Sequence, residues 1–215
     1  MAKLNAHIIP VTPFQQNCTV LFDEESKNGV LIDPGGDLPI ILDAIKKADV
    51  TIDAIWLTHG HFDHASSAMD AKDALNVEII GPHFEDKFLL DELERSTITY
   101  QLPYKVRNCV PDRWLHDGDE LFVDEHRFKV IHAPGHTPGH VIFYNEDIKF
   151  IIMGDVLFHN SIGRTDLPGG NQATLLASIK NKVLPLGDDV EFICGHGAGS
   201  RLGVERRSNP FLQNL

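Results

Sequence analysis

The feature that most constrains this chain is a short run of four side chains that can bind metal ions, namely His59, His61, Asp63 and His64. The apolar stretch before it predicts a buried strand over Ile52–Thr58, so the run begins where a strand ends. His59 and His61 are two residues apart and should point to the same side of an extended loop. Asp63 and His64 follow around the bend and should reach a neighbouring position. Imidazole combined with carboxylate favours zinc, iron or manganese.

Three more residues of the same kinds follow other predicted strands. His136 lies in the Gly- and Pro-rich stretch Ala133–His140, after a strand predicted over His126–His132. Asp155 and His196 each follow an apolar stretch that ends in glycine. Strand ends that meet at one edge of a sheet can bring such side chains together. The sequence therefore predicts a two-metal site made of His59, His61, Asp63, His64, His136, Asp155 and His196.

These predicted ligands imply a hydrolytic chemistry. Two divalent ions about 3.5–4 Å apart can share one water and one carboxylate, and they lower the pKa of that water towards ~7. Asp155 is the expected bridging carboxylate, because an unpaired acidic residue beside an apolar strand has little other purpose. The bridging hydroxide would attack a carbonyl carbon while one metal polarises the carbonyl oxygen. Asp63 is a ligand when two ions are bound and a general base when only one is bound.

Composition argues against several other classes of protein. The formal net charge of the 215 residues is −12, and no run of Lys or Arg would follow a phosphate backbone, so we expect no nucleic-acid partner. No apolar stretch approaches about 18 residues and no signal peptide is visible, so we expect no membrane association. The three cysteines form no disulfide framework, which favours a cytoplasmic location. We expect a small-molecule substrate and a monomer or small homo-oligomer.

The order of the predicted elements indicates a single domain of the α/β class over residues 1–215. Strands occur in two groups with helices after each, which predicts a four-layer αββα sandwich with the two sheets face to face. The local predictions are an N-cap at Asp37 for a helix over about Leu38–Ala48, a helix over about His64–Leu75, a loop near the site mouth over Thr97–Pro111, and a last strand over Val190–Cys194.

Other polar residues close to the motifs receive structural interpretations. His132 is predicted to face the core from its strand, and His140 to support the site or a turn. Asp33 ends a strand before Pro34 and is expected to hold the loop behind the site by hydrogen bonds. Cys194 lies two residues before His196 and is predicted to be a buried strand residue rather than a metal ligand.

The residues described so far resemble a known family. The H-x-H-x-D-H run at 59–64 is similar to the metal-binding motif of the metallo-β-lactamase-fold superfamily, and so are the stretches PGHTPGH around His136, MGD at Asp155 and CGHG at His196. The similarity covers nearly the whole chain, from LIDPGG near Asp33 to Glu205–Leu212. Within the superfamily it is strongest to the glyoxalase II group (hydroxyacylglutathione hydrolases), in particular the compact bacterial YcbL or GloC type.

This resemblance implies a ligand assignment and a reaction. It implies that Asp155 bridges two metal ions and that the reaction is hydrolysis of S-lactoylglutathione to D-lactate and glutathione. The first ion would be bound by His59, His61 and His136, and the second by Asp63, His64 and His196.

The chain departs from the larger glyoxalase II enzymes in the part that binds glutathione. Those enzymes carry a C-terminal helical domain with basic contacts, whereas here only residues 197–215 follow the last metal-type histidine. Ala198 stands where they have a tyrosine, and Arg164 and Asp166 stand where they have lysine and tyrosine. Arg164 is the predicted substrate-binding residue, because a guanidinium binds a carboxylate through two parallel hydrogen bonds.

A second reading comes from the same superfamily. A mononuclear iron persulfide dioxygenase shares the fold, and its Gly-Arg-Thr-Asp sequence resembles Gly163–Asp166. In that reading His59, His136 and Asp155 would hold a single iron. Hydrolysis of a lactone or another ester-like substrate is a further alternative, ahead of a β-lactamase and of a non-catalytic metal-binding protein.

Overall fold

The computed structural model describes residues 3–99, 105–213 and 215, and its first sheet is built from the N-terminal part of the chain. Across this sheet the strands are β1 (Leu4–Val11), β2 (Gln16–Asp23), β3 (Asn28–Ile32), β4 (Thr51–Trp56) and β5 (Glu78–Ile80). β1, β2 and β3 pair in antiparallel fashion, whereas β3, β4 and β5 are parallel. Every residue of β2 is buried, as expected for a strand covered on both faces.

The second sheet is built from the C-terminal half. Across it the strands are β13 (Ser200–Arg201), β12 (Glu191–Cys194), β9 (Phe150–Gly154), β8 (Val141–Asn145), β7 (His126–His132) and β6 (Glu120–Val123). β12 and β9 are parallel, and the other neighbours are antiparallel. A separate two-stranded hairpin, β10 (Leu157–Phe158) with β11 (Ser161–Ile162), follows β9.

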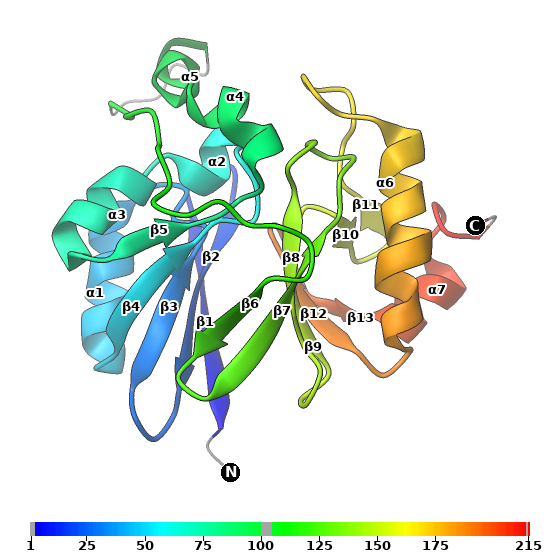
Figure 1. Ribbon diagram of the computed structural model, residues 1–215, viewed down its shortest axis with the longest axis horizontal. Helices are drawn as coiled ribbons and strands as arrows, with labels where there is room; N and C mark the ends of the chain where they lie inside the picture. Colours follow the sequence, from blue (N-terminus) through cyan, green and yellow to red (C-terminus); the bar gives the residue numbers. More distant parts are fainter. Residues whose placement is uncertain (1–2, 100–104, 214) are drawn as a thin grey trace.

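Helices cover the outer face of each sheet, and a second group of helices lies at the upper edge of the first sheet in Figure 1. The α-helices are α1 (Leu38–Ala48), α2 (Phe62–Ala65), α3 (Ala68–Leu75), α4 (Lys87–Leu90), α5 (Leu93–Thr99), α6 (Gln172–Ser178) and α7 (Leu202–Ser208). Three further helical turns are η1 (Phe84–Asp86), η2 (Ile179–Val183) and η3 (Leu184–Leu186). Figure 1 shows α1 and α3 outside the first sheet and α6 and α7 outside the second. Within the described residues, no helix combines the length and apolar character needed to cross a lipid bilayer.

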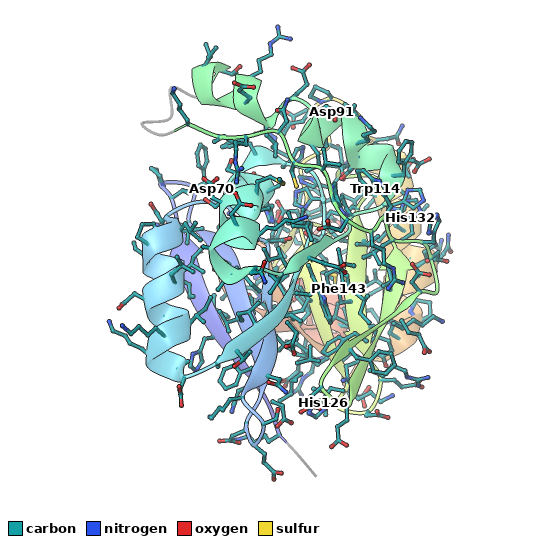
Figure 2. The ribbon with its side chains drawn as sticks, turned by 60° about the vertical axis from the view of Figure 1, so that its left-hand side comes forward. Asp70, Asp91, Trp114, His126, His132 and Phe143 are labelled. Carbon is teal, nitrogen blue, oxygen red and sulfur yellow. The ribbon has the colours of Figure 1, made fainter. Side chains whose placement is uncertain are left out.

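Three buried apolar clusters separate these layers. One contains Ile41 of α1 and Ile55 of β4, and another contains Ile151 of β9 and Leu175 of α6. The central cluster lies between the sheets, where the rings of Trp56 and Phe143 are 5.1 Å apart at their centroids and Phe128 packs on the same indole at 5.7 Å. Phe143 lies in the interior of the molecule in Figure 2. Three apolar layers between four layers of backbone confirm the predicted αββα sandwich.

Asp37 precedes α1 but does not cap it in the predicted way. Its backbone is left-handed, with φ of 48°, and its carboxylate accepts no hydrogen bond from the helix. Instead Oδ2 of Asp37 accepts a hydrogen bond from the backbone N–H of Thr12 at 2.6 Å. Pro39 in the first turn removes one of the amides that a cap would satisfy. Asp37 therefore occupies the predicted N-cap position and the helix has the predicted bounds, but the side chain of Asp37 makes no capping hydrogen bond.

The helix predicted over about His64–Leu75 is divided into α2 and α3, so its prediction as one helix was wrong. The break lies at Ser66 and Ser67. The backbone N–H of Ser67 donates to the carbonyl oxygen of Pro34 at 2.9 Å rather than to the preceding turn of its own helix. This contact with a distant loop ends α2 after one turn and leaves His64 on a segment anchored behind the site.

Two further local predictions need correction. In the loop predicted over Thr97–Pro111, α5 continues through Thr99, residues 100–104 lie outside the described residues, and residues 105–111 have no regular secondary structure. Val190–Cys194 is not the last strand, because β13 follows it and pairs with β12. β13 has only two residues, too few for an alternating apolar pattern to be visible in the sequence.

Candidate metal centre

The structure brings the seven predicted site residues to one edge of the sandwich. His59 and His61 lie between β4 and α2, and His136 lies between β7 and β8. Asp155 follows β9 and His196 follows β12. Two sets of three side chains each place their donor atoms within 4.8 Å of one another, and these are His59, His61 and His136 in the first set and Asp63, His64 and His196 in the second.

Asp155 lies between the two sets. Its Oδ2 is 3.5 Å from Nε2 of His136 in the first set and 3.6 Å from Nε2 of His196 in the second. Its Oδ1 is 3.4 Å from Nε2 of His64. One carboxylate thus faces donor atoms of both sets, which is the position that the sequence predicted for a bridging group.

Hydrogen bonds fix the orientation of His59 and His136. Nδ1 of His59 lies 3.0 Å from the hydroxyl of Thr58, which donates its own proton to Asp33 at 2.6 Å and so accepts from the imidazole. Nδ1 of His136 donates to the carbonyl oxygen of Arg164 at 2.8 Å. A neutral imidazole that donates through Nδ1 keeps a lone pair on Nε2. Nε2 of His59 is therefore free to bind a cation, and Nε2 of His136 presents its lone pair towards His61.

His64 and His196 are oriented in the same manner. Nδ1 of His64 donates to Oδ2 of Asp33 at 2.9 Å, and Nδ1 of His196 donates to the carbonyl oxygen of Phe14 at 3.1 Å. Outer partners of this kind select the tautomer and aim of a metal-binding histidine. The predicted role of Asp33 in holding the loop behind the site agrees with these contacts.

His61 differs from the other four histidines. Its Nδ1 lies 2.9 Å from Nε2 of His136, so these two nitrogen atoms face the same point. Two unprotonated imidazole nitrogens repel each other at this distance unless a proton or a cation lies between them. A proton on Nδ1 of the neutral His61 satisfies this contact as a hydrogen bond, and a metal ion that accepts both lone pairs would satisfy it equally.

Unpaired buried atoms support the fit of metal ions to this donor set. Within the described residues, Nε2 of His59, Nε2 of His64 and Oδ1 of Asp155 are buried without a hydrogen-bond partner. Buried polar atoms are normally paired, because burial without a partner costs about 1–3 kcal/mol each. Three such atoms directed into one site are satisfied if they coordinate a divalent cation.

The first set of histidines is held in the uncharged form. Burial lowers the pKa of His61 to about 3, and the nearby His136 contributes to this shift. Burial also lowers the pKa of His136 to about 4, and it lowers that of His59 well below its usual value. Neutral imidazole is the form that binds metal, so these residues need no deprotonation at neutral pH.

The second set is rich in carboxylate. Burial lowers the pKa of His64, but Asp155, Asp33 and Asp63 outweigh it and raise that pKa to about 9. Burial raises the pKa of Asp63, but His196 and His64 outweigh it and hold that pKa well below its usual value. The negative charge of these carboxylates therefore stabilises a positive charge beside them, which is a proton on His64 unless a metal ion replaces it.

Two buried side chains, those of Asp86 and His140, stabilise the loops of the site by hydrogen bonds. Asp86 is buried and accepts hydrogen bonds from the N–H of Gly60 at 2.8 Å, the hydroxyl of Thr137 at 2.7 Å and the N–H of Gly139 at 2.6 Å. His140 accepts from the N–H of Asp155 at 3.0 Å, which agrees with its predicted supporting role. Asp86 lies in η1 outside every motif, so no local signal identified it.

His132 does not face the core as predicted. Its side chain is half-buried at the end of β7, where Nε2 donates to the carbonyl oxygen of Pro138 at 2.8 Å. His132 lies on the same face of β7 as Phe128 and Val130 of the central cluster, but at the strand end its ring stacks on that of His83 at 4.3 Å instead of on apolar side chains. Cys194 is buried and free, as predicted.

A cavity of about 530 Å³ opens onto both sets of ligands, since its lining includes His61 of the first set and Asp63 of the second. Asp63, His136, Asp155 and His196 form its floor. Its walls are largely apolar and include Phe14, Phe62, Phe158, Ile162 and Leu167. A small ligand in this cavity would have a reactive group at the metal-binding residues and an apolar part against the aromatic rings.

Arg164 also lines this cavity, as its predicted role in substrate binding requires. Its Nε and Nη2 donate to the two carboxylate oxygens of Asp166, each at 2.8 Å. The guanidinium is thus already engaged in the two-point geometry expected for a substrate carboxylate. Both side chains are largely exposed, so exchange of Asp166 for a ligand carboxylate costs little.

Comparison with known proteins agrees with this geometry. A family model described as the metallo-beta-lactamase superfamily matches residues 11–196. The chain belongs to this superfamily. The cluster of His and Asp side chains is accordingly a divalent metal site of the superfamily, held at the edge where its two sheets meet.

Three similar proteins cover nearly the whole chain. Hydroxyacylglutathione hydrolase GloC of Haemophilus influenzae is 45% identical over 212 residues, which is 98% of this chain and 99% of the relative. The crystal structure of the B3 metallo-beta-lactamase BLEG-1 is 36% identical with a TM-score of 0.88, covering 98% of this chain and 100% of that one. TTHA1623 in a di-iron-bound form is 35% identical with a TM-score of 0.86, covering 96% and 100%.

Proposed function

We propose that this superfamily member is a metal-dependent thioester hydrolase that converts S-lactoylglutathione to D-lactate and glutathione. The observation that carries the proposal is the convergence of five histidines and two aspartates, four of the imidazoles being tied through Nδ1 so that Nε2 faces the site. The similarity to the hydroxyacylglutathione hydrolase GloC supports the choice of a glutathione thioester.

Each set of ligands is proposed to hold one divalent cation, of zinc, iron or manganese. His59, His61 and His136 would bind the first cation and Asp63, His64 and His196 the second, with Asp155 between them. Two such ions lower the pKa of coordinated water towards about 7 and polarise a carbonyl oxygen, which is the chemistry that thioester hydrolysis requires. In this arrangement Asp63 and Asp155 act as ligands in direct contact with the reacting centre.

The cavity supports the orientation of the substrate. The thioester carbonyl would lie over Asp155, since this residue forms the floor between the two sets of ligands. The aromatic walls of Phe14, Phe62 and Phe158 exclude water and contact the apolar part of the ligand. Arg164 is proposed to bind a glutathione carboxylate at the rim in exchange for Asp166.

The test is hydrolysis of S-lactoylglutathione by the purified protein in the strict absence of oxygen. We expect release of glutathione and D-lactate at an unchanged rate when oxygen is excluded. The competing function, an iron persulfide dioxygenase, requires oxygen and would consume it when glutathione persulfide is added. Oxygen uptake with the persulfide and no thioester turnover would replace the hydrolase proposal with the dioxygenase.

A cytoplasmic location and a monomer or small homo-oligomer are part of the same proposal. Cys18, Cys109 and Cys194 are all buried free thiols, a state that a reducing compartment maintains. Glutathione thioesters are small molecules of such a compartment, so the proposed substrate and the thiols are consistent with each other.

A further inference from the structure

A short hairpin forms one wall of the cavity. β10 and β11 lie between Asp155 and Arg164, and the side chains of Phe158, Ser161 and Ile162 contribute to the cavity lining. The ring of Phe158 lies 6.2 Å from that of His196 on the floor. The hairpin contains only two residue pairs, and so short a hairpin is not stable alone. Other contacts must therefore hold it against the cavity.

Glu205 of α7 holds the turn of this hairpin. Its carboxylate is fully buried and accepts hydrogen bonds from Nδ1 of His159 at 3.1 Å and from the backbone N–H of Asn160 at 2.8 Å. The hydroxyl of Ser200 donates to the same carboxylate. Burial raises the pKa of Glu205, but these donors outweigh it and lower the pKa, so the group is ionised at neutral pH. Charge-assisted bonds of this kind are stronger than neutral ones.

Asn209, one residue beyond α7, holds the strands on either side of the turn. Its buried side-chain amide donates to the carbonyl oxygen of Ser161 at 3.0 Å and to that of Phe158 at 3.4 Å. The same amide nitrogen donates to Glu205 at 2.9 Å. Glu205 and Asn209 are thus hydrogen-bonded to each other, and together they hold the tip of the hairpin, residues 158–161, by hydrogen bonds. In Figure 1 the hairpin and α7 lie on the same side of the molecule, beside α6.

The base of the hairpin is held by different residues. The carbonyl oxygen of Arg164 accepts from Nδ1 of His136, and a Cβ on Gly163 would lie 1.9 Å from the carbonyl oxygen of Asp155. These contacts keep the base against the metal-binding residues whether or not the tip is held. Loss of the hydrogen bonds at the tip should therefore move the side chains of Phe158 and Ile162, while Asp155 and His136 keep their positions.

We propose that Glu205 and Asn209 are positioning residues that hold the β10–β11 hairpin as the wall of the substrate cavity and thereby set affinity for the thioester. This inference rests on the proposed thioesterase function for its kinetic consequence. It assigns a role to the C-terminal stretch Glu205–Leu212, which lies outside the residues that bind metal.

The test compares Glu205→Gln and Asn209→Ala with the wild-type holoenzyme. Weakening a buried charge-assisted hydrogen bond favours release of the hairpin by about tenfold, and a substrate that needs the hairpin in place then binds up to about tenfold more weakly. We expect KM for S-lactoylglutathione to rise about tenfold in each variant, with kcat within about twofold and with metal content unchanged. Glu191→Gln is the matched control, because Glu191 forms an exposed ion pair with Arg201 on the neighbouring strands and should leave KM unaltered.

A double variant tests whether Glu205→Gln raises KM through the position of Phe158 in the cavity wall. If Glu205 works by placing Phe158, adding Glu205→Gln to Phe158→Ala should raise KM little beyond the Phe158→Ala value. Fully additive effects on KM, or an equal fall in kcat and metal content, would overturn the proposal, since both indicate damage elsewhere in the site.

Amide hydrogen exchange gives a readout that does not depend on turnover. We expect residues 157–163 to exchange about tenfold faster in Glu205→Gln, while the strands β8 and β9 keep the wild-type rate. Unchanged exchange in that segment would overturn the inference even if the folded variant loses activity. A wild-type protein that hydrolyses no thioester would refute the proposed function, and the exchange comparison would still decide whether the hairpin is held as described.

Discussion

Nδ1 of His64 lies 2.9 Å from Oδ2 of Asp33, and both side chains are buried. Asp33 also accepts hydrogen bonds from the N–H and the hydroxyl of Thr58 at 2.8 and 2.6 Å, and that hydroxyl contacts Nδ1 of His59 at 3.0 Å. One carboxylate that coordinates nothing in our assignment thus orients a residue of each ligand set. The orientation of His59 and His64 therefore depends on this residue.

Replacement of Asp33 tests this dependence. Because outer partners of metal-binding histidines contribute about 10–100-fold to metal affinity, we expect Asp33→Ala to weaken binding by that factor. Competition with a coloured chelator measures the affinity, and circular dichroism checks that the variant is folded. Asp43→Ala is the control, since Asp43 forms only an exposed pair with Lys47 on α1. Equal metal affinity in the wild type and Asp33→Ala would refute the role given to Asp33.

The backbone of Gly195 lies so close to the carboxylate of Asp155 that a side chain at this position should disrupt the site. A Cβ at this position would lie 2.0 Å from Oδ1 of Asp155, so Gly195→Ala must displace the carboxylate between the two ligand sets. We expect loss of metal and at least about a hundredfold loss of activity in a protein that remains folded. Gly118→Ala is the matched comparison, because its Cβ meets no atom within 4 Å and only the left-handed backbone is strained. A fully loaded, active Gly195→Ala protein would contradict the geometry of the site.

The aromatic contacts between the sheets predict that two phenylalanines contribute very differently to the free energy of unfolding. Phe143 is completely buried against Trp56, whereas Phe122 is 56% exposed. We expect Phe143→Ala to lower the free energy of unfolding by about 3–5 kcal/mol, and Phe122→Ala to change it by less than about 0.5 kcal/mol. Urea denaturation followed by tryptophan fluorescence measures both. Similar losses in the two variants would mean that the sheets do not pack as described.

Asp23 predicts a pH dependence of stability far from the metal centre. Its carboxylate accepts hydrogen bonds from the N–H of Ser26 and from Nε2 of His126, each at 2.9 Å, and these lower its pKa to about 2. His126 lies at the end of the molecule opposite α4 in Figure 2. Because the pKa falls on folding, ionised Asp23 stabilises the folded state above about pH 4, and this contribution is lost as the pH falls towards 2.

The comparison with Asp23→Asn isolates this contribution. The variant keeps an oxygen that can accept from Ser26 but loses the charge. We expect the wild type to be more stable than Asp23→Asn at pH 7, with the difference in unfolding free energy shrinking between about pH 4 and pH 2. A difference that is constant across this range would show that the charge of Asp23 has no part in it.

The residues of the candidate site could be selected from the sequence because their signals are local. His59, His61 and His64 lie in one motif, and Asp155 and His196 each follow an apolar strand that ends in glycine. A strand end fixes where a side chain lies in an αββα sandwich, so local pattern was enough to bring the residues to a common edge. The same reasoning predicted the layers, since buried strands and amphipathic helices are recognised from short windows.

What the sequence could not indicate depends on contacts between distant segments. Asp86 binds Gly60 and Gly139, which are 26 and 53 residues away, and no motif surrounds it. The break between α2 and α3 results from a bond between Ser67 and Pro34, on a loop that precedes the helix by an entire strand and helix. Such partners follow from the packing of the sheets, which local propensity does not encode.

The most direct measurement is the number of metal ions per chain in the purified protein and in Asp155→Ala and His59→Ala. We expect about two ions of zinc, iron or manganese per wild-type chain. In each variant we expect fewer ions, folding close to wild type and at least about a thousandfold less hydrolysis of S-lactoylglutathione. A single ion per wild-type chain, or thioester turnover retained in either variant, would contradict a two-metal centre built on these residues.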